Sequence, residues 1–215
     1  MWQRCYRTDA QSPGEMGDER KSIRVVMRNY HIILASNSPR RRELLSGLDL
    51  EYEVKVLPDI EEGYPEGLSM EEIPRYIAAE KAAAYKDIIA DNDLIITADT
   101  VVVLGDEVLG KPTDLDDARR MLRELSGKTH QVITGVYLMT KEKERGFSVV
   151  TDVTFKELSD EEIDYYVEKY RPLDKAGAYG IQEWIGYIGV TGLNGSYFNV
   201  MGLPVQRIYN ELLLF

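Results

Sequence analysis

Apolar and polar positions along the chain alternate as in strands in some segments and recur at helical spacing in others. The first clear element is a strand. Residues 31–35, His-Ile-Ile-Leu-Ala, form a short, apolar, β-prone run. Pro39 suits the first position of a helix, and Ser38 can cap that helix from the position before it. We therefore expect a strand, a tight loop and a helix that begins at Pro39.

The later apolar runs predict further strands. Residues 52–56 alternate as a strand does, and residues 94–104 form an apolar strand that a polar triplet, residues 98–100, interrupts. A hairpin turn at residues 105–106 leads to residues 108–109. Residues 129–139 and 147–155 are expected to pair as strands, with the charged run 141–145 as a solvated loop between them.

Helix-start signals lie between these strands. Ser69 with Glu72, and Ser159 with Glu162, have the spacing of capping boxes, which predicts helices to about residue 90 and to about residue 170. Asp114 is placed to cap a helix that continues to about residue 125.

The two ends of the chain differ from its middle. Glycines between residues 177 and 202 predict irregular backbone, and a last helix is expected to begin near Pro204. Because helices and strands alternate without a linker or a repeat, we expect one α/β domain over residues 27–215. Residues 1–26 are polar and show neither period, so we expect a disordered extension and hypothesise that translation begins at Met27.

Composition and charge narrow the classes of function. The 215 residues carry a formal net charge of −11, which argues against a general nucleic-acid binder and against a protein that binds anionic membranes. The longest uncharged stretch, residues 184–206, contains five glycines and a proline, so we do not expect a membrane span. The lack of a signal-peptide core and the single cysteine agree with a cytoplasmic protein.

The most informative segment is residues 35–45, Ala-Ser-Asn-Ser-Pro-Arg-Arg-Arg-Glu-Leu-Leu. It places two hydroxyls and three guanidiniums where a strand becomes a helix. Loop N–H groups and the positive end of the helix dipole suit an anion there, and arginine adds bidentate donors for phosphate oxygens. The alternative is a capped helix with solvated arginines, and the segment alone does not decide between the two.

The few histidines and the single cysteine exclude several kinds of catalytic site. The chain has two histidines, His31 and His130, which argues against a histidine-rich metal site and against a Ser-His-Asp triad. Its one cysteine, Cys5, has no neighbouring motif that would lower its pKa. Carboxylates, lysines and a metal ion remain as the groups that could carry a reaction.

Asp99 is the carboxylate with the clearest signal. It lies inside an otherwise apolar strand, where an unpaired carboxylate is costly to bury, so it needs a metal, a cation or an open cleft. A structural aspartate that caps nearby backbone is the alternative. Glu61 and Glu62 could supply a second carboxylate for Mg²⁺, although such a cluster is also typical of a solvated loop. Lys81 on a helix and Lys111 in a Gly-Lys-Pro turn would by themselves be surface lysines.

Eight blocks in order give the chain a resemblance to a known family. From about residue 30 to the C-terminus it resembles the Maf family, the septum-formation-inhibitor-like nucleotide pyrophosphatases. The matching blocks are residues 35–45, 58–62, 79–82, 97–102, 110–112, 125–132, 174–182, and 195–197 with 202–204.

The resemblance implies a fold and a reaction. The fold is a long, twisted, mixed sheet flanked by helices, with a central cleft between two lobes, as in inosine-triphosphatase-like proteins. The reaction is the hydrolysis of a nucleoside triphosphate to the monophosphate and pyrophosphate with a divalent metal cation, Mg²⁺ or Mn²⁺. A homodimer is also implied.

The resemblance further suggests roles for individual residues. By hypothesis Asp99 is the general base, and Glu62 is a metal ligand or its assistant. Whether Asp99 also binds the metal, activates water, or does both stays open. The phosphates are expected to be held by Ser36, Ser38, Arg41, Lys81 and Lys111.

Three positions bear on the choice of base. The family has a branch that hydrolyses dTTP and UTP and a branch that prefers 7-methyl-GTP. In the 7-methyl-GTP branch, the three positions are occupied by Trp, Gln and Glu. Here they are Arg40, Thr100 and Gln182, as in the dTTP/UTP branch. Gln182 offers a donor and an acceptor to a pyrimidine edge. Modified pyrimidine nucleotides fit the same expectation.

Two other functions are alternatives to this one. A P-loop NTPase is disfavoured because the chain has no Gly-x-x-x-x-Gly-Lys-Ser/Thr motif. A regulator that acts by binding a cell-division partner is compatible with enzymatic activity, but it would not need Asp99, Lys81 and Lys111 beside a phosphate loop.

Overall fold

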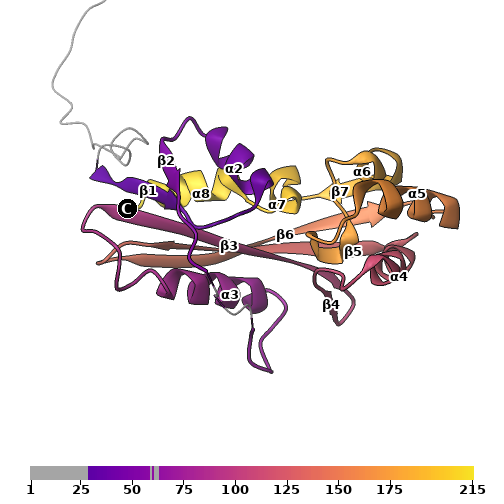
Figure 1. The fold of residues 1–215 in the computed structure, drawn as a ribbon, viewed down its shortest axis with the longest axis horizontal. Helices are drawn as coiled ribbons and strands as arrows, with labels where there is room; N and C mark the ends of the chain where they lie inside the picture. Colours follow the sequence, from indigo (N-terminus) through magenta and orange to yellow (C-terminus); the bar gives the residue numbers. More distant parts are fainter. Residues whose placement is uncertain (1–28, 59, 61–62) are drawn as a thin grey trace, which may run out of the picture.

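A mixed β-sheet forms the centre of the protein in the computed structural model, which describes residues 29–58, 60 and 63–215 (Figure 1). The expectations for residues 1–26 and for Glu62 therefore lie outside the described residues. The sheet has seven strands in the order β2-β1-β3-β5-β6-β7, with β4 beside β3. The predicted α/β fold with a mixed sheet is confirmed.

Strand β3 joins a parallel part of the sheet to an antiparallel part. Its first residues pair in parallel with β1, which pairs in parallel with β2, and its later residues pair in antiparallel fashion with β4 and β5. Strands β6 and β7 continue the antiparallel part. The strands are β1 His31–Leu34, β2 Tyr52–Val54, β3 Asp93–Leu104, β4 Glu107–Leu109, β5 Thr129–Met139, β6 Glu144–Phe155 and β7 Val190–Asn194.

Helices cover both faces of the sheet. In Figure 1, α2, α7 and α8 lie on one face, α3 lies on the other, and α4, α5 and α6 gather at the far end. Their bounds are α2 Pro39–Ser46, α3 Glu72–Ala83, α4 Leu115–Leu125, α5 Asp160–Tyr170, α6 Trp184–Gly189, α7 Tyr197–Met201 and α8 Val205–Leu212, with a short 3-10 turn η1 at Ala176–Ala178.

Two buried clusters give the molecule its two lobes. In one lobe, Leu45 of α2 and Ile208 of α8 pack against Leu34 of β1. In the other, Leu122 of α4 and Tyr166 of α5 are fully buried in one cluster. Burial of apolar area is the main favourable contribution to such packing. Because both lobes stand on the same sheet, the segments between them line a central cleft.

Close contact between α3 and the sheet depends on one glycine. A Cβ atom built on Gly135 of β5 would lie 2.1 Å from the backbone nitrogen of Arg75 and 2.2 Å from the carbonyl carbon of Pro74. Any larger residue would therefore push α3 away from the strand. This approach sets the distance of Lys81, which lies later on α3, from the middle of the sheet.

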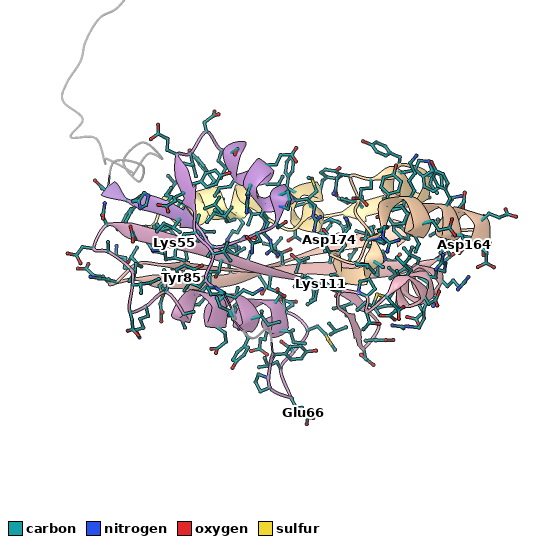
Figure 2. All side chains as sticks on the ribbon, viewed as in Figure 1. Lys55, Glu66, Tyr85, Lys111, Asp164 and Asp174 are labelled. Atoms are coloured by element: carbon teal, nitrogen blue, oxygen red, sulfur yellow. The ribbon has the colours of Figure 1, made fainter. Side chains whose placement is uncertain are left out.

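Several predicted boundaries differ from the observed ones. Helix α3 ends at Ala83, well before residue 90. The buried Tyr85 explains the early end, because its hydroxyl donates to the Lys55 carbonyl at 2.7 Å and accepts from the Leu57 N–H at 3.0 Å (Figure 2). The chain after α3 turns to make these contacts, so tertiary contacts outweigh helix propensity here.

The second difference concerns β6 and the glycine-rich segment. Strand β6 begins at Glu144, because the Thr140 N–H donates to the Lys143 carbonyl at 2.8 Å and closes a tight turn. The predicted loop 141–145 is therefore too long. Irregular backbone over residues 177–202 is wrong for α6, β7 and α7, which form there because β7 pairs with the edge of β6.

Within the described part of the chain, no helix is long and apolar enough to cross a membrane.

Candidate active site

A cavity of about 550 Å³ opens between the two lobes. Lys111 and Asp174, both in its wall, lie near the middle of the molecule in Figure 2. Nine of the ten predicted site residues line this one cavity, and the tenth, Glu62, lies outside the described residues. The nine are Ser36, Ser38, Arg40, Arg41, Lys81, Asp99, Thr100, Lys111 and Gln182.

The loop after β1 forms one wall. The Ala35 N–H donates to the Ile96 carbonyl at 2.9 Å, which continues the parallel pairing to the end of β1. The loop thus leaves the carboxyl end of a parallel strand, where open α/β sheets bind ligands. Ser36 is buried, and its hydroxyl accepts from the Ser38 N–H at 3.2 Å, which fixes the turn into α2.

Ser38 occupies the predicted N-cap position of α2, with Pro39 at the start of the helix. Its hydroxyl makes no capping hydrogen bond with the described residues, so the expected side-chain cap is wrong. The hydroxyl lines the cavity and can meet a ligand beside the N-terminus of the helix.

Asp99 on β3 and Lys81 on α3 form an ion pair inside the cavity. The Lys81 ammonium donates to Asp99 Oδ1 at 2.8 Å, and the two side chains are only 12% and 14% exposed. The sequence required a metal, a cation or an open cleft for this carboxylate, and the structure supplies both a cation and a cavity. Lys111, after β4, lies in the same wall.

Arg41 connects three parts of the cavity wall. Its guanidinium donates from Nε to the Gly202 carbonyl at 2.8 Å, from Nη1 to the Ala98 carbonyl at 2.8 Å, and from Nη2 to Thr100 Oγ1 at 3.1 Å. Gly202 ends α7 with a φ of 109°, a left-handed conformation that glycine adopts without strain. The fork of Arg41 thus fixes α2 against β3 and against the end of α7.

Thr100 continues this network into the core. Its hydroxyl lies 3.0 Å from that of Thr134 on β5, and Thr134 Oγ1 donates to the Asn199 carbonyl at 3.0 Å. Thr134 and Asn199 are fully buried. A position expected to select the base is thereby held by hydrogen bonds to Arg41 and to Thr134.

Arg40 does not share the partners of Arg41 but pairs with Asp174. Its Nη1 donates to Asp174 Oδ2 at 2.9 Å, and Lys175 Nζ donates to Asp174 Oδ1 at 2.7 Å. Burial opposes ionisation of Asp174, but the hydrogen bonds from Lys175 and Arg40 outweigh it and lower the pKa of the carboxyl to about 2. Asp174 is therefore a carboxylate at neutral pH.

Lys175 was not predicted as a site residue. It lines the cavity and is only 8% exposed, with Glu183 Oε1 at 3.2 Å as a second carboxylate partner. The one signal in the sequence was its place in the block 174–182, between an aspartate and a glycine turn. A single lysine in such a turn is usually a surface residue, so the pattern did not single it out.

Among the predicted site residues that line the cavity, Gln182 has a side-chain oxygen without a hydrogen-bond partner in the described part of the chain. Its Oε1 is buried and has no hydrogen-bond partner among the described residues, although the side chain lines the cavity. Buried polar atoms are normally paired, so this oxygen is an acceptor whose hydrogen bond the described residues do not supply.

A divalent cation would find a small set of donors here. The described residues contain no cluster of three or more His, Cys, Asp or Glu side chains that could hold a metal ion. Both carboxylates of the described wall carry cationic partners: Asp174 pairs with Arg40 and Lys175, whereas Asp99 pairs with Lys81 through Oδ1. Mg²⁺ commonly uses one or two protein carboxylates together with phosphate oxygens and water, so a larger cluster is not required for it.

Comparisons with known proteins extend this picture. A sequence profile of the family described as Maf-like protein matches residues 31–215. The dTTP/UTP pyrophosphatase of Phocaeicola vulgatus is 68% identical over 186 residues, which are 86% of this chain and 96% of that protein. The dTTP/UTP pyrophosphatase of Parabacteroides distasonis is 60% identical over the same shares.

A further curated relative and one solved structure also match. The dTTP/UTP pyrophosphatase of Flavobacterium psychrophilum is 51% identical over 89% of this chain and 97% of that protein. A solved structure described as that of a HAM1 protein from Coxiella burnetii covers 86% of this chain and 100% of its own, with 16% identity and a TM-score of 0.47.

Proposed function

Because the chain belongs to the Maf family, we propose that it is a nucleoside triphosphate pyrophosphatase that converts dTTP and UTP to the monophosphate and pyrophosphate. Relatives named dTTP/UTP pyrophosphatase, 68% and 60% identical over 96% of their own length, support this assignment. The structural observation that carries it is one cavity whose wall contains Asp99, Lys81, Lys111 and the loop before α2.

The proposed reaction needs a base beside the α phosphate. A water molecule attacks the α phosphorus, the bond to the bridging oxygen breaks, and pyrophosphate leaves with the electron pair of that bond. We assign Asp99 as the group that takes the proton from the attacking water. Lys81 donates to Oδ1 and orients the carboxylate, so we assign Oδ2 as the proton acceptor.

The same wall offers donors for the triphosphate. We propose that the hydroxyls of Ser36 and Ser38 and the ammonium groups of Lys81 and Lys111 bind its oxygens, because positive charge aimed at the leaving group stabilises the transition state. Arg41 already donates to two backbone carbonyls and to Thr100, so we propose that it supports phosphate binding by holding this wall in place.

We further propose that catalysis requires Mg²⁺ or Mn²⁺, with Asp99 as the described residue that would hold the cation. Glu62 stays a prediction as a second ligand. When bound, such a cation would neutralise negative charge on the phosphate oxygens. The substrate itself would supply most of the remaining ligands.

Choice of base is assigned to three other residues of the cavity wall. We propose that Arg40, Thr100 and Gln182 favour thymine and uracil over 7-methylguanine. The unpaired, buried Oε1 of Gln182 supports this, because an acceptor suits the N3–H that thymine and uracil share. A homodimer remains an implication of the family resemblance.

A nucleotide panel tests the proposal. The purified chain is incubated with dTTP, UTP, dCTP, dATP, dGTP and 7-methyl-GTP, each with Mg²⁺ or with Mn²⁺, and phosphorus NMR identifies the products. We expect monophosphate and pyrophosphate from dTTP and UTP, and no turnover after chelation of the metal. Release of orthophosphate, or preference for 7-methyl-GTP, would contradict the assignment.

A further inference from the structure

Lys175 is a buried, charged donor for which the proposed reaction has no use. The residue is 8% exposed and lines the cavity on the side of the segment 174–182. Burying an ammonium group is costly unless it is paired and hydrogen-bonded. The surroundings of Lys175 show how that cost is met.

Two carboxylates on either side of Lys175 balance its charge. Asp174 Oδ1 accepts a hydrogen bond from Nζ at 2.7 Å, and Glu183 Oε1 lies 3.2 Å from Nζ. Asp174 also pairs with Arg40 at 2.9 Å, so the four groups carry two positive and two negative charges. The set is therefore neutral as a whole, with the two carboxylates beside the lysine next to the cavity.

The position of Glu183 is itself fixed by a buried tyrosine. The hydroxyl of Tyr166 donates to Glu183 Oε2 and accepts from the Gly180 N–H at 3.1 Å. Burial and the hydrogen bond to Glu183 raise the pKa of Tyr166 above its usual value, so it remains a donor at all relevant pH values. Contacts of this kind reduce the freedom of a long side chain such as lysine.

An ammonium group has three donors, and the contacts above do not use all of them. One N–H of Lys175 forms a hydrogen bond with Asp174, while Glu183 attracts the charge from 3.2 Å. Gln182, the neighbour of Glu183 in the chain, lines the same cavity, and its Oε1 is a buried acceptor without a partner among the described residues. This wall thus offers a charged donor and a neutral acceptor together.

That pair of groups matches one edge of a pyrimidine. Thymine and uracil present an N3–H donor next to the O4 acceptor, whereas cytosine presents an N3 acceptor next to an exocyclic amino donor. A site built from an acceptor and a cationic donor would pair with the edge of thymine or uracil. With cytosine, the acceptor of the site would face the N3 acceptor, and the cationic donor would face the amino donor. Such mismatches discriminate strongly between substrates.

We propose that Lys175 is a further specificity-determining residue, which donates a hydrogen bond from Nζ to O4 of the thymine or uracil base while Gln182 Oε1 accepts from N3–H. The proposal rests on the proposed function, because it presumes that pyrimidine nucleotides enter this cavity. Asp174 and Glu183 are positioning residues, which act on the base through Lys175.

Thio-substituted nucleotides test the contact in the unmodified protein. Sulfur accepts hydrogen bonds more weakly than oxygen, so 4-thio-UTP weakens the proposed contact, while 2-thio-UTP keeps O4 and serves as the matched control. We expect kcat/KM for 4-thio-UTP to fall by roughly tenfold or more relative to UTP, with a much smaller loss for 2-thio-UTP. A larger penalty for 2-thio-UTP, or equal penalties, would overturn the assignment.

Calorimetric binding of the monophosphates separates this proposal from the proposed function. UMP, 4-thio-UMP and 2-thio-UMP are compared without any turnover. If UMP binds and the 4-thio penalty appears while UTP is not hydrolysed, the proposed function fails and the contact stands. If UMP binds with no penalty specific to the 4-thio form, the contact fails whatever the activity. If neither UTP nor UMP interacts with the protein, both fail.

A lysine variant supplies the second measurement. Lys175→Met should lower kcat/KM for dTTP and UTP more than for dCTP, and it should abolish the difference between UTP and 4-thio-UTP. Lys169→Met, which removes an exposed lysine from α5, controls for the lost charge. Equal loss for every nucleotide would assign Lys175 to phosphate or to the fold and would overturn the proposal.

Discussion

The ammonium of Lys81 lies 2.8 Å from the Asp99 carboxylate, although the two residues belong to a helix and a strand on different layers of the molecule. The close approach of α3 to β5 at Gly135 helps to bring the helix near enough for this contact. The pair explains how a carboxylate persists in the middle of an apolar strand. It also fixes the direction in which the second carboxylate oxygen can meet a ligand.

Removal of the proposed base should abolish turnover without unfolding the protein. Asp99→Asn keeps the shape of the side chain and its contact with Lys81 but cannot accept the proton, so kcat should fall by about 100-fold or more. Steady-state kinetics with dTTP measure this. Asp93→Asn is the matched control on the same strand, because Asp93 pairs with His31 at 2.9 Å and is not among the described residues that line the cavity.

The outcomes of that comparison are distinct. Asp93→Asn should lower the melting temperature while kcat/KM stays near that of the unmodified protein. Substantial turnover by a folded Asp99→Asn variant would remove Asp99 from the role of base. Loss of activity in both variants would instead indicate an effect on the strand that they share.

Arg41 should be sensitive to a substitution that keeps its charge. Lysine cannot reproduce three hydrogen bonds from one planar fork, so Arg41→Lys should lose about 1–3 kcal/mol of folding stability. Because the proposed effect on phosphate works through the cavity wall, kcat/KM should fall by a similar factor for every accepted nucleotide. Urea denaturation and kinetics with dTTP and UTP measure the two effects.

Arg42→Lys controls for the Arg41 substitution, since Arg42 follows on the same helix and is not among the described residues of the cavity wall. It should leave the activity on both nucleotides close to that of the unmodified protein. A loss in Arg41→Lys that is confined to one base would show that Arg41 contacts the base.

Three separated positions are expected to set the choice of base together. Arg40, Thr100 and Gln182 come from α2, β3 and the segment before α6, yet all line one cavity. Combining Arg40→Trp, Thr100→Gln and Gln182→Glu should lower the ratio of kcat/KM for dTTP to that for 7-methyl-GTP by roughly tenfold or more, because buried polar groups lose their partners on thymine. Equal losses on both substrates would contradict the assignment.

Local signals in the sequence predicted the elements with strong caps and regular alternation. The predicted bounds of β5, residues 129–139, are those observed, and the Ser159 capping box of α5 forms in full. Elements that depend on partners far along the chain were missed. Strand β7 has a glycine-rich sequence and exists because β6 offers it an edge, and α3 ends early because Tyr85 reaches Lys55 and Leu57.

The same division applies to the candidate site. The motif around Ser36 and the polar interruption at Asp99 were visible in the sequence, because each breaks an apolar pattern. The different partners of Arg40 and Arg41 were not, since adjacent positions on a helix point in different directions and only the fold decides what each meets. Lys175 required the juxtaposition of Asp174 and Glu183, which no local pattern encodes.

His130 should make folding stability depend on pH. The ring is buried 2.7 Å from the Tyr179 hydroxyl, and Nδ1 has no partner among the described residues. Burial lowers the pKa of His130 from 6.5 to about 4. In the unfolded chain the imidazole takes up a proton near pH 6.5, while the folded protein resists protonation until about pH 4. Between these values the unfolded state therefore binds more protons, and stability falls as the pH falls.

The size and the test of this effect follow from the same shift. The difference between the pKa of His130 in the unfolded and the folded state corresponds to a loss of roughly 3 kcal/mol in the free energy of unfolding between neutral pH and pH 4. Urea denaturation at several pH values should show the decline, and His130→Gln should flatten it because glutamine does not titrate. Proton NMR of the two histidines should show one ring that stays neutral below pH 5 and is absent from the spectrum of His130→Gln. An unchanged slope in His130→Gln would assign the pH dependence to other groups.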